Sequence, residues 1–375
     1  MSTQSQDVGE NVGQAGSPAI ARCAPGDERE LIAFRTAVHG PQTIFADAGY
    51  FRWMYCDPHT SSSDRMTCWV YRAAERIEGQ IGGFPVVLKV GETETPALWA
   101  LDGAVSTDHR GKGVLEALLD SIGQEREVEM ATEVTPGGRR VMLRKGWVDI
   151  GTLPLFIRPL DIGAILTKRA GRLGGFIGQA IGLLGRGLEL QALAAAARDG
   201  LALEQIASFD ASADRIWEQS SPSYPVICRR DSAYLNWRFA RFPKERYRFF
   251  YLVRSASEPV GYCVLRAGAR YGLRAGYIVD FLCAPRWTRP LVALCLQHFR
   301  REGMAAVCCI HRNPVSSTPF ISLGFLPRST SWQCVLRTRD PAASAFALAK
   351  DSGKWFLTAG DSDLDRPRPE DSVNP

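Results

Sequence analysis

The sequence predicts an α/β protein in which one mixed-sheet domain occurs twice in tandem. The chain has 375 residues, more than the roughly 250–300 at which a single hydrophobic core stops growing. Strand-like apolar runs followed by helical spacing occur in both halves of the chain. An aromatic motif also recurs, reading YFRWMY from Tyr50 and YLNWRF from Tyr234.

The spacing between matching residues supports the duplication. Trp53 and Trp237 are 184 residues apart, and later pairs settle at a spacing of 178. A nearly constant spacing predicts two copies of one domain, over 27–160 and 206–338. The alternative is that α/β domains share an apolar strand rhythm. The pairs at 178 are Asp102 with Asp280, Pro136 with Pro314, and Gly146 with Gly324.

Each copy reads as strands, a helix and a further strand. In the first copy CWVYRA, GGFPVVLKV and ALWALDGAV are strand-like, and a helix is expected over 113–126. A strand near 128–134, a helix near 137–145 and a strand near 150–158 follow. The second copy repeats this order, with a helix expected over 290–302. Antiparallel strands around a strand–helix–strand unit predict a mixed sheet with helices on its faces.

Three segments lie outside the two copies. Residues 1–26 are polar and Gly-rich and read as a disordered leader, without the apolar core of a signal peptide. Residues 161–205 read as a helical linker, packed across both domains or lying on a membrane surface through 161–200. Seven glycines weaken a free-standing helix and favour packing. In the tail, 339–375, Trp355 and Phe356 are expected to dock on a domain.

Composition excludes several classes of protein. The chain has 45 Lys and Arg against 40 Asp and Glu, with no dense basic run, which argues against a nucleic-acid partner. No run of 18 apolar residues predicts a membrane span. The ten cysteines show neither Cys-x-x-Cys nor zinc spacing, so we expect core thiols, a cytoplasmic location and no metal.

The segment with the clearest chemical signal is a Gly-rich loop. A strand ends near Ser106, and the loop Arg110-Gly111-Lys112-Gly113 opens directly into a helix. Such a loop directs several backbone N–H groups at one point, where the helix dipole and two cations favour an anion. The pattern is neither Gly-Lys-Ser/Thr nor Gly-x-Gly-x-x-Gly. The loop is suited to bind a pyrophosphate group.

This loop resembles motif A of the Gcn5-related N-acetyltransferases, the GNAT superfamily. Val105 and the four loop residues match, whereas Leu115 stands where the motif has Gly or Ala, as in enhanced-intracellular-survival-like members. The resemblance implies two tandem GNAT folds, acetyl-CoA as co-substrate and direct acyl transfer to an amine. It also implies a set of CoA-binding residues: Ala104, Val105, Ser106, Arg110, Gly111, Lys112, Gly113, Val114 and Leu115.

Direct transfer requires a general base and an acid. Asp102 and Glu133 are the base candidates, since both fall on the central strands; either could instead be a structural carboxylate with a charged partner. The acid in this superfamily is usually a Tyr, but Met142 occupies that position. Tyr50, Tyr55 and Tyr71 are substitutes that the sequence does not place.

The second copy is expected to be degenerate. At the position of Arg110 it has Thr288, and two prolines, Pro285 and Pro290, remove N–H donors from the loop region. His311 stands in place of Glu133, as a functional relic or a structural residue. Trp53 and Trp237 either line acceptor pockets or belong to the core.

We therefore predict an N-acetyltransferase with one CoA site and a primary-amine acceptor. The acceptor is a small molecule or a glycan, such as an amino sugar, an aminoglycoside-like amine or an amino acid. The alternative is a non-catalytic acyl-CoA-binding or scaffold protein. A tRNA-dependent peptidyltransferase of the Fem type also pairs two such folds, but it does not need a pyrophosphate loop.

Overall fold

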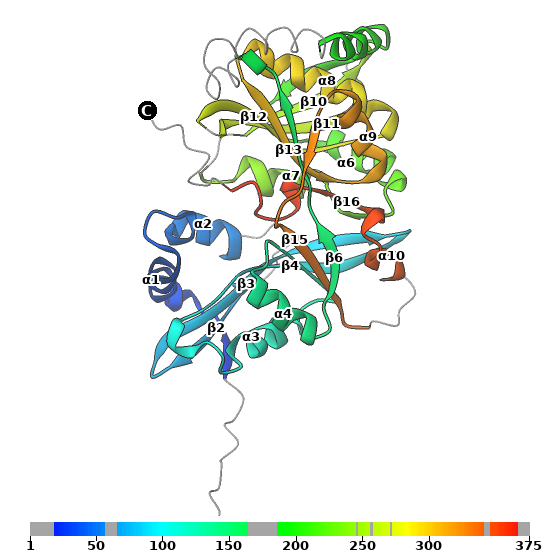
Figure 1. The fold of residues 1–375 in the computed structure, drawn as a ribbon. Coiled ribbons are helices and arrows are strands. Elements are labelled where there is room, and N and C mark those ends of the chain that lie inside the picture. The colour runs from blue at the N-terminus through cyan, green and yellow to red at the C-terminus, as the bar shows by residue number, and fades with distance from the viewer. Residues whose placement is uncertain are drawn as a thin grey trace, which may run out of the picture.

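Two halves with the same order of elements make up the structure, a computed structural model (Figure 1). It describes residues 19–56, 66–163, 186–244, 247–255, 258–270, 272–340 and 346–366. We call residues 19–163 the first half and residues 186–340 the second half. Both contain a mixed sheet covered by helices, so the expected α/β class is confirmed.

Helices cover both faces of the sheet in the first half. Its helices are α1 (Glu28–His39), α2 (Ala48–Phe51), α3 (Val114–Ile122) and α4 (Pro136–Arg144); the first two lie on one core and the last two on another. Its strands are β1 (Ile20–Arg22), β2 (Cys68–Ala73), β3 (Arg76–Val90), β4 (Thr93–Val105), β5 (Val128–Thr132), β6 (Val148–Thr152) and β7 (Leu155–Pro159). Leu118, Leu119 and Ile122 on one face of α3 are fully buried, which explains why the predicted helical spacing forms here.

The second half repeats the order. Its helices are α6 (Ala211–Ser220), α7 (Ser232–Leu235), α8 (Pro285–Arg301) and α9 (Pro314–Ser322). Its strands are β8 (Ala202–Ile206), β9 (Val226–Cys228), β10 (Arg248–Arg254), β11 (Glu258–Arg270), β12 (Leu273–Cys283), β13 (Ala306–Arg312), β14 (Leu326–Arg328) and β15 (Gln333–Thr338). Residues 186–198 form a helix before β8.

Strands cross between the halves: besides β7 and β15, β9 of the second half pairs with β3 of the first. β7, from the first half, lies between β13 and β14 of the second sheet. β15, from the second half, lies between β5 and β6 of the first sheet. The strand orders are therefore β1-β2-β3-β4-β5-β15-β6 and β8-β10-β11-β12-β13-β7-β14.

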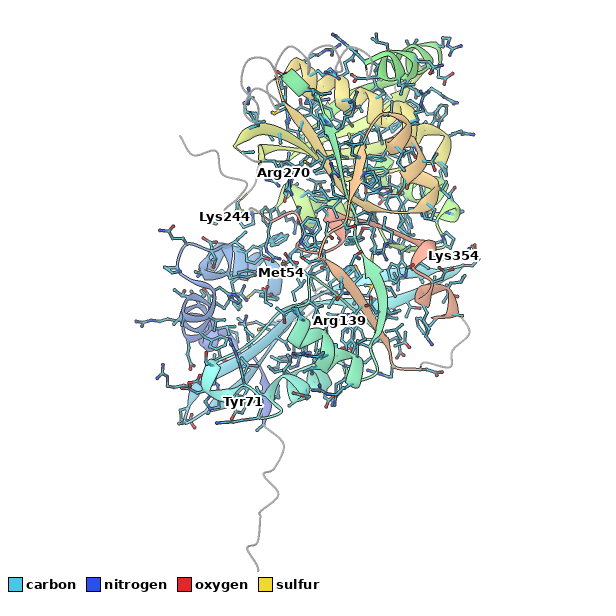
Figure 2. All side chains as sticks on the ribbon, in the orientation of Figure 1. Met54, Tyr71, Arg139, Lys244, Arg270 and Lys354 are labelled. Carbon is cyan, nitrogen blue, oxygen red and sulfur yellow. The ribbon has the colours of Figure 1, made fainter. Side chains whose placement is uncertain are left out.

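The two aromatic motifs meet at the boundary between the halves. Each motif forms a short helix that continues into a π-helical turn, and the rings of Trp53 and Trp237 stack with centroids 5.1 Å apart. Each indole N–H donates to the other tryptophan's carbonyl, at 2.8 and 3.3 Å. Met54 of the first turn lies at this boundary in Figure 2. Both tryptophans are thus core residues.

The chain then returns to the boundary. α10 (Phe346–Lys350) precedes β16 (Trp355–Thr358), which pairs with β9 and with β13. We call Trp355–Arg366 the C-terminal segment; it is drawn in red between the halves in Figure 1. Trp355 and Phe356 are fully buried, so the expected docking of the tail is confirmed.

The structure corrects two predicted boundaries. Residues 20–22 of the expected disordered leader form β1 and pair with β2, while 1–18 lie outside the described residues. Residues 202–205 of the expected linker belong to β8, an edge strand of the second sheet. Residues 164–185, which carry the membrane-surface interpretation, also lie outside the described residues. In the part of the chain that is described, no helix is long and apolar enough to cross a bilayer.

Candidate functional site

The Gly-rich loop has the geometry of an anion site. Gly111 and Gly113 have φ values of +75° and +77°, a region that favours glycine. A Cβ added at either glycine would meet no atom within 4 Å, so the space above the loop is open. Gly113 precedes α3 directly, and the first N–H groups of that helix, from Val114 onward, border this space. A phosphate group fits such a cradle.

The loop's side chains are exposed at its rim. Arg110 and Lys112 are both exposed, and the Arg110 Nε donates to the carbonyl oxygen of Val105 at 3.1 Å. On the other side of the sheet, Phe34 and Val38 of α1 help to line a cavity of about 350 Å³ that also reaches Arg110. The two cations are therefore available to a ligand at the surface.

Next to the loop the two central strands separate. Pairing between β4 and β5 ends at Trp99 and Met130, although β4 continues to Val105. Gly103 is exposed within this stretch, and its added Cβ would lie 3.8 Å from Leu115. Ala104, Val105 and Ser106 continue along the same opening toward the loop. The predicted CoA-binding residues thus follow one another along the end of β4, the loop and the start of α3.

Asp102 lies at a β-bulge in this opening. Its φ is +54°, and β4 carries one extra residue against β3 between the pairs Gln80–Ala104 and Gly82–Leu101. The carboxylate accepts from the Arg35 guanidinium at 3.0 Å and from the Tyr55 hydroxyl. Burial opposes the charge of Arg35, but Asp102 together with Tyr55 and Tyr50 outweighs burial and raises the pKa of that guanidinium.

The same arrangement recurs in the second half. Asp280 borders a bulge at Val279, which lies between the pairs Val264–Asp280 and Leu265–Ile278. Its carboxylate accepts from Arg230 at 3.3 Å and from the Tyr262 hydroxyl at 2.8 Å. An Arg–Asp–Tyr group that recurs beside a different loop points to a structural carboxylate at both positions.

Glu133 lies at the end of β5, across the opening from Asp102. Its φ is +56°, and its carboxylate accepts from Arg366 at 2.6 Å. Arg366 also pairs with Asp363. Burial raises the pKa of Asp363; Arg366 opposes this effect, while Asp102 and Glu133 add to it. Asp102 and Glu133 therefore both lie within electrostatic reach of Asp363.

The tyrosines that the sequence could not place take different positions. Burial and the nearby Asp102 raise the pKa of both Tyr50 and Tyr55 well above the ordinary range. Among the described residues the buried Tyr50 hydroxyl has no hydrogen-bond partner. Tyr71 lies against His109, with ring centroids 5.6 Å apart, at the far end of the first half in Figure 2. Met142 is buried in the core.

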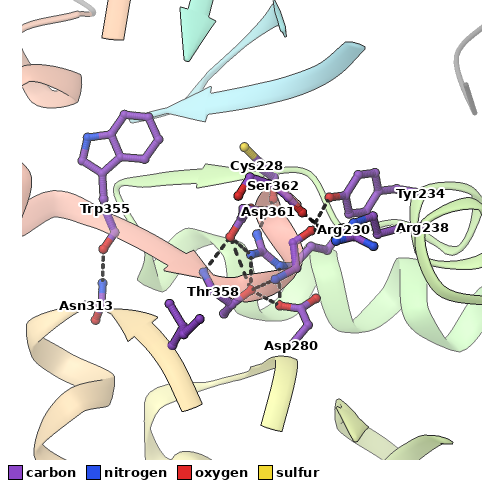
Figure 3. Close-up of polar contacts among 12 residues, drawn as sticks. Cys228, Arg230, Tyr234, Arg238, Asp280, Asn313, Trp355, Thr358, Asp361 and Ser362 are labelled. Atoms are coloured by element: carbon purple, nitrogen blue, oxygen red, sulfur yellow. Dashed lines mark hydrogen bonds and ion pairs between the residues drawn. The ribbon is translucent and has the colours of Figure 1, made fainter. Parts of the chain in front are cut away.

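In the second half the C-terminal segment fills the corresponding opening. Pairing between β12 and β13 ends at Ile278 and Cys309, and β16 pairs with the free part of β13. Figure 3 shows Thr358 and Asp361 beside Arg230 and Asp280. The Thr358 hydroxyl donates to Asp280 at 2.7 Å, and Arg230 donates to Asp361 at 2.5 Å.

The second half also lacks the loop. α8 begins at Pro285, two residues after β12 ends, and Thr288 is buried in the first turns of the helix. His311 is buried, and its Nε2 lies 2.7 Å from the Ser316 hydroxyl. Burial lowers the pKa of His311 to about 3, so the ring is neutral. This environment is that of a structural histidine.

Sequence reasoning missed the contribution of the C-terminal segment. Asp361, Asp363 and Asp365 alternate in the sequence, which resembles part of a calcium loop. In the structure they point to different arginines: Asp361 pairs with Arg230, and Asp363 with Arg366. Within the described residues no three His, Cys, Asp or Glu side chains converge as a metal ion would require. The only signal in the sequence was the alternation of the three aspartates, and it does not identify their arginine partners.

Comparison with known proteins identifies the fold. No protein-family model and no curated protein sequence matches the chain. Among solved structures, a GCN5-related N-acetyltransferase from Anabaena variabilis matches with a TM-score of 0.60 at 12% identity, over 86% of this chain and 73% of the other. A probable N-acyltransferase from Enterococcus faecalis matches with a TM-score of 0.57 at 8% identity, over 86% and 72%.

A third match comes from a eukaryote. The N-myristoyltransferase of Saccharomyces cerevisiae, solved with bound myristoyl-CoA, has a TM-score of 0.52 at 11% identity, over 86% of this chain and 82% of the other. All three structures span most of both halves. Together with the motif-A loop and the separated central strands, they show that this chain has the fold of the GNAT superfamily.

Proposed function

We propose that the protein transfers an acyl group from acyl-CoA, with acetyl-CoA as the expected donor, to a primary amine. One observation carries this proposal: the opening between the central strands is accessible beside a Gly-rich loop in the first half. In the second half the same opening is filled by the chain's own C-terminal segment. We therefore assign one acyl-CoA site to each chain.

The residues around the opening fit coenzyme A. Gly111 and Gly113 leave room for a pyrophosphate, and the N–H groups at the start of α3, at Val114 and Leu115, would donate to it. Arg110 and Lys112 add positive charge at the rim. Backbone groups of Ala104, Val105 and Ser106 would pair with the pantetheine arm. Coenzyme A supplies an activated thioester, whose carbonyl would face Glu133 and Asp102.

An ammonium group must lose a proton before its nitrogen can attack a thioester. We propose Glu133 as the acceptor-side base, because its side chain is 25% exposed at the end of β5. The Asp102 side chain is only 3% exposed and is held by Arg35 and Tyr55. We therefore propose that Asp102 maintains the bulge, although the sequence also made it a candidate for the base. The acceptor, a glycan amino sugar or a smaller amine, enters beside Glu133.

The second candidate function is acyl-CoA binding without transfer. Met142, at the position usual for the acid, favours this alternative, because its side chain is buried and cannot donate a proton. The buried Tyr50 and Tyr55 hydroxyls are close to the carboxylates and remain protonated, so a donor is present in the same region. A measurement of acyl-transfer turnover therefore distinguishes an acyltransferase from a protein that only binds acyl-CoA.

Calorimetry tests the cofactor assignment. Acetyl-CoA should bind once per chain. Arg110→Ala should weaken binding about 10- to 150-fold, since a charge-assisted hydrogen bond contributes roughly 1.5–3 kcal/mol. Gly113→Val should weaken it further, because valine disfavours a φ of +77° and would occupy the open space.

S-acetylpantetheine, which lacks the pyrophosphate, is the control ligand. Both variants should bind it nearly as well as the wild type does. Equal losses for the two ligands would mean that the substitutions disturb the fold. Two equivalent sites per chain would contradict the assignment of the second half. Mass-spectrometric screening of amino sugars, aminoglycosides and amino acids for acetylation then tests transfer.

A further inference from the structure

The C-terminal segment connects the filled opening of the second half to the accessible opening of the first. Trp355–Thr358 pairs with β13 as β16, and Arg238 donates to the Ser362 carbonyl oxygen at 2.6 Å. The Ser362 hydroxyl then lies 2.9 Å from the Thr132 hydroxyl at the end of β5. The C-terminal segment therefore extends from the filled opening of the second half to the accessible opening of the first half.

The end of this segment meets the first half through one arginine. Arg366 donates to Glu133 at 2.6 Å and pairs with Asp363, and its guanidinium lies 5.1 Å from the Phe45 ring centroid. Burial opposes its charge, but the surrounding acidic groups, Asp363 and Glu133 foremost, together raise the pKa of Arg366. The arginine is thus a fixed cation between two carboxylates.

Glu133 depends on this cation for its orientation. A non-glycine residue at a φ of +56° is strained, and such a conformation persists only when its surroundings hold it. The hydrogen bond between Thr132 and Ser362 fixes the preceding residue, and Arg366 fixes the carboxylate itself. Both contacts come from the C-terminal segment.

We propose that Arg366 is a positioning residue of the acyl-transfer site, which the C-terminal segment completes by orienting Glu133 toward the acceptor amine. This inference rests on the proposed function and extends it. The catalytic carboxylate lies on the first half, whereas the group that orients it comes from the last described residue of the chain. The C-terminal segment thereby fills the opening in the second half and orients the proposed base at the opening in the first half.

The test compares Arg366→Met, Arg366→Lys and a matched control. The control is Arg337→Met, because Arg337 of β15 also pairs with a β5 carboxylate, Glu129, at 2.5 Å. The arginine side chains are similarly exposed, at 18% for Arg366 and 17% for Arg337. Glu129 lies where β4 and β5 are still paired, away from the opening.

Acetyl transfer to the best amine of the screen is measured together with acetyl-CoA affinity and the melting temperature. Arg366→Met should lower kcat about 10- to 100-fold, the loss that follows when a reacting group is misplaced by about 1 Å. Acetyl-CoA affinity should stay within about twofold. Arg366→Lys should recover part of the rate, since lysine keeps the charge but not the fork. Arg337→Met should lower the melting temperature and leave kcat unchanged.

A double-mutant cycle separates positioning from a general loss of structure. If Arg366 acts through Glu133, Glu133→Gln combined with Arg366→Met should be no slower than Glu133→Gln alone. Additive losses, or equal kcat losses in Arg366→Met and Arg337→Met, would overturn the inference. A wild-type protein that binds acetyl-CoA and transfers it, with Arg366→Met equally fast, would overturn the inference alone. A wild-type protein that does not bind acetyl-CoA would instead refute the proposed function.

Discussion

Substitution of Asp102 by Asn distinguishes a structural carboxylate from a catalytic base. The Asp102 and Arg35 side chains are 3% and 0% exposed, and their charged atoms are 3.0 Å apart. Asn keeps the shape and a hydrogen-bond acceptor for Tyr55, but it leaves the Arg35 charge buried without a counter-ion. Breaking a buried ion pair in this way costs about 3–5 kcal/mol of unfolding free energy.

The expected change in melting temperature follows from the size of the chain. An unfolding entropy of about 2.1 cal/mol/K per residue gives roughly 0.8 kcal/mol/K for 375 residues, so Asp102→Asn should melt about 4–6 °C lower. Replacing both partners together, as Arg35→Met with Asp102→Leu, should recover most of this loss, because no charge remains buried.

Differential scanning calorimetry and the transfer assay, run on the same preparations, give the answer. Glu133→Gln is the comparison, since Glu133 is partly exposed and its loss should change the unfolding free energy by about 1 kcal/mol or less. Asp102→Asn should retain turnover at temperatures well below its melting point. An Asp102→Asn protein with wild-type stability and turnover reduced by ~10²–10⁴ would refute the structural role and make Asp102 the base.

Three further predictions concern the second half and the C-terminal segment. Asp280→Asn should destabilise the protein as Asp102→Asn does while leaving acetyl-CoA affinity unchanged, as calorimetry can measure. The pKa of His311 is lowered to about 3 by burial. The neutral ring therefore contributes fully to the stability of the folded protein above the unfolded-state pKa of about 6.5, and this contribution is lost as the pH falls toward 3. His311→Gln should therefore reduce the loss of unfolding free energy between pH 7 and pH 5 by about 2 kcal/mol, measured in urea; an unchanged pH dependence would contradict this. Deletion of 355–375 removes three fully buried apolar side chains, Trp355, Phe356 and Leu357, each contributing about 1.5–3 kcal/mol, and should yield little soluble protein.

Local patterns in the sequence were enough to predict most elements. The apolar spacing of Val114, Leu118 and Ile122 predicted α3, and the alternation of glycine with cations predicted an anion loop. Each of these two patterns lies within about ten consecutive residues, and tertiary packing reinforces the local structure that it predicts. The expected strand over 150–158 proved to be two, β6 and β7, because Leu153 and Pro154 interrupt the run.

Contacts between distant segments could not be predicted in this way. Nothing in the composition of β7 or β15 tells which sheet each will join, because both sheets offer apolar faces and unpaired edges. The partners of Glu133 were equally hidden, since Arg366 lies 233 residues away. Asp102 was recognised as a carboxylate in an apolar strand, but its partner Arg35 could only be found from the fold.

The strand exchange has a consequence for biosynthesis. The first half leaves the ribosome first, yet its sheet lacks the strand between β5 and β6 until residue 338 has been made. At about 5–20 residues per second, the interval from residue 160 to residue 338 lasts roughly 10–35 s. During that time the β5 and β6 edges are open to other chains. The first sheet therefore stays incomplete, with two open edges, until β15 has been translated.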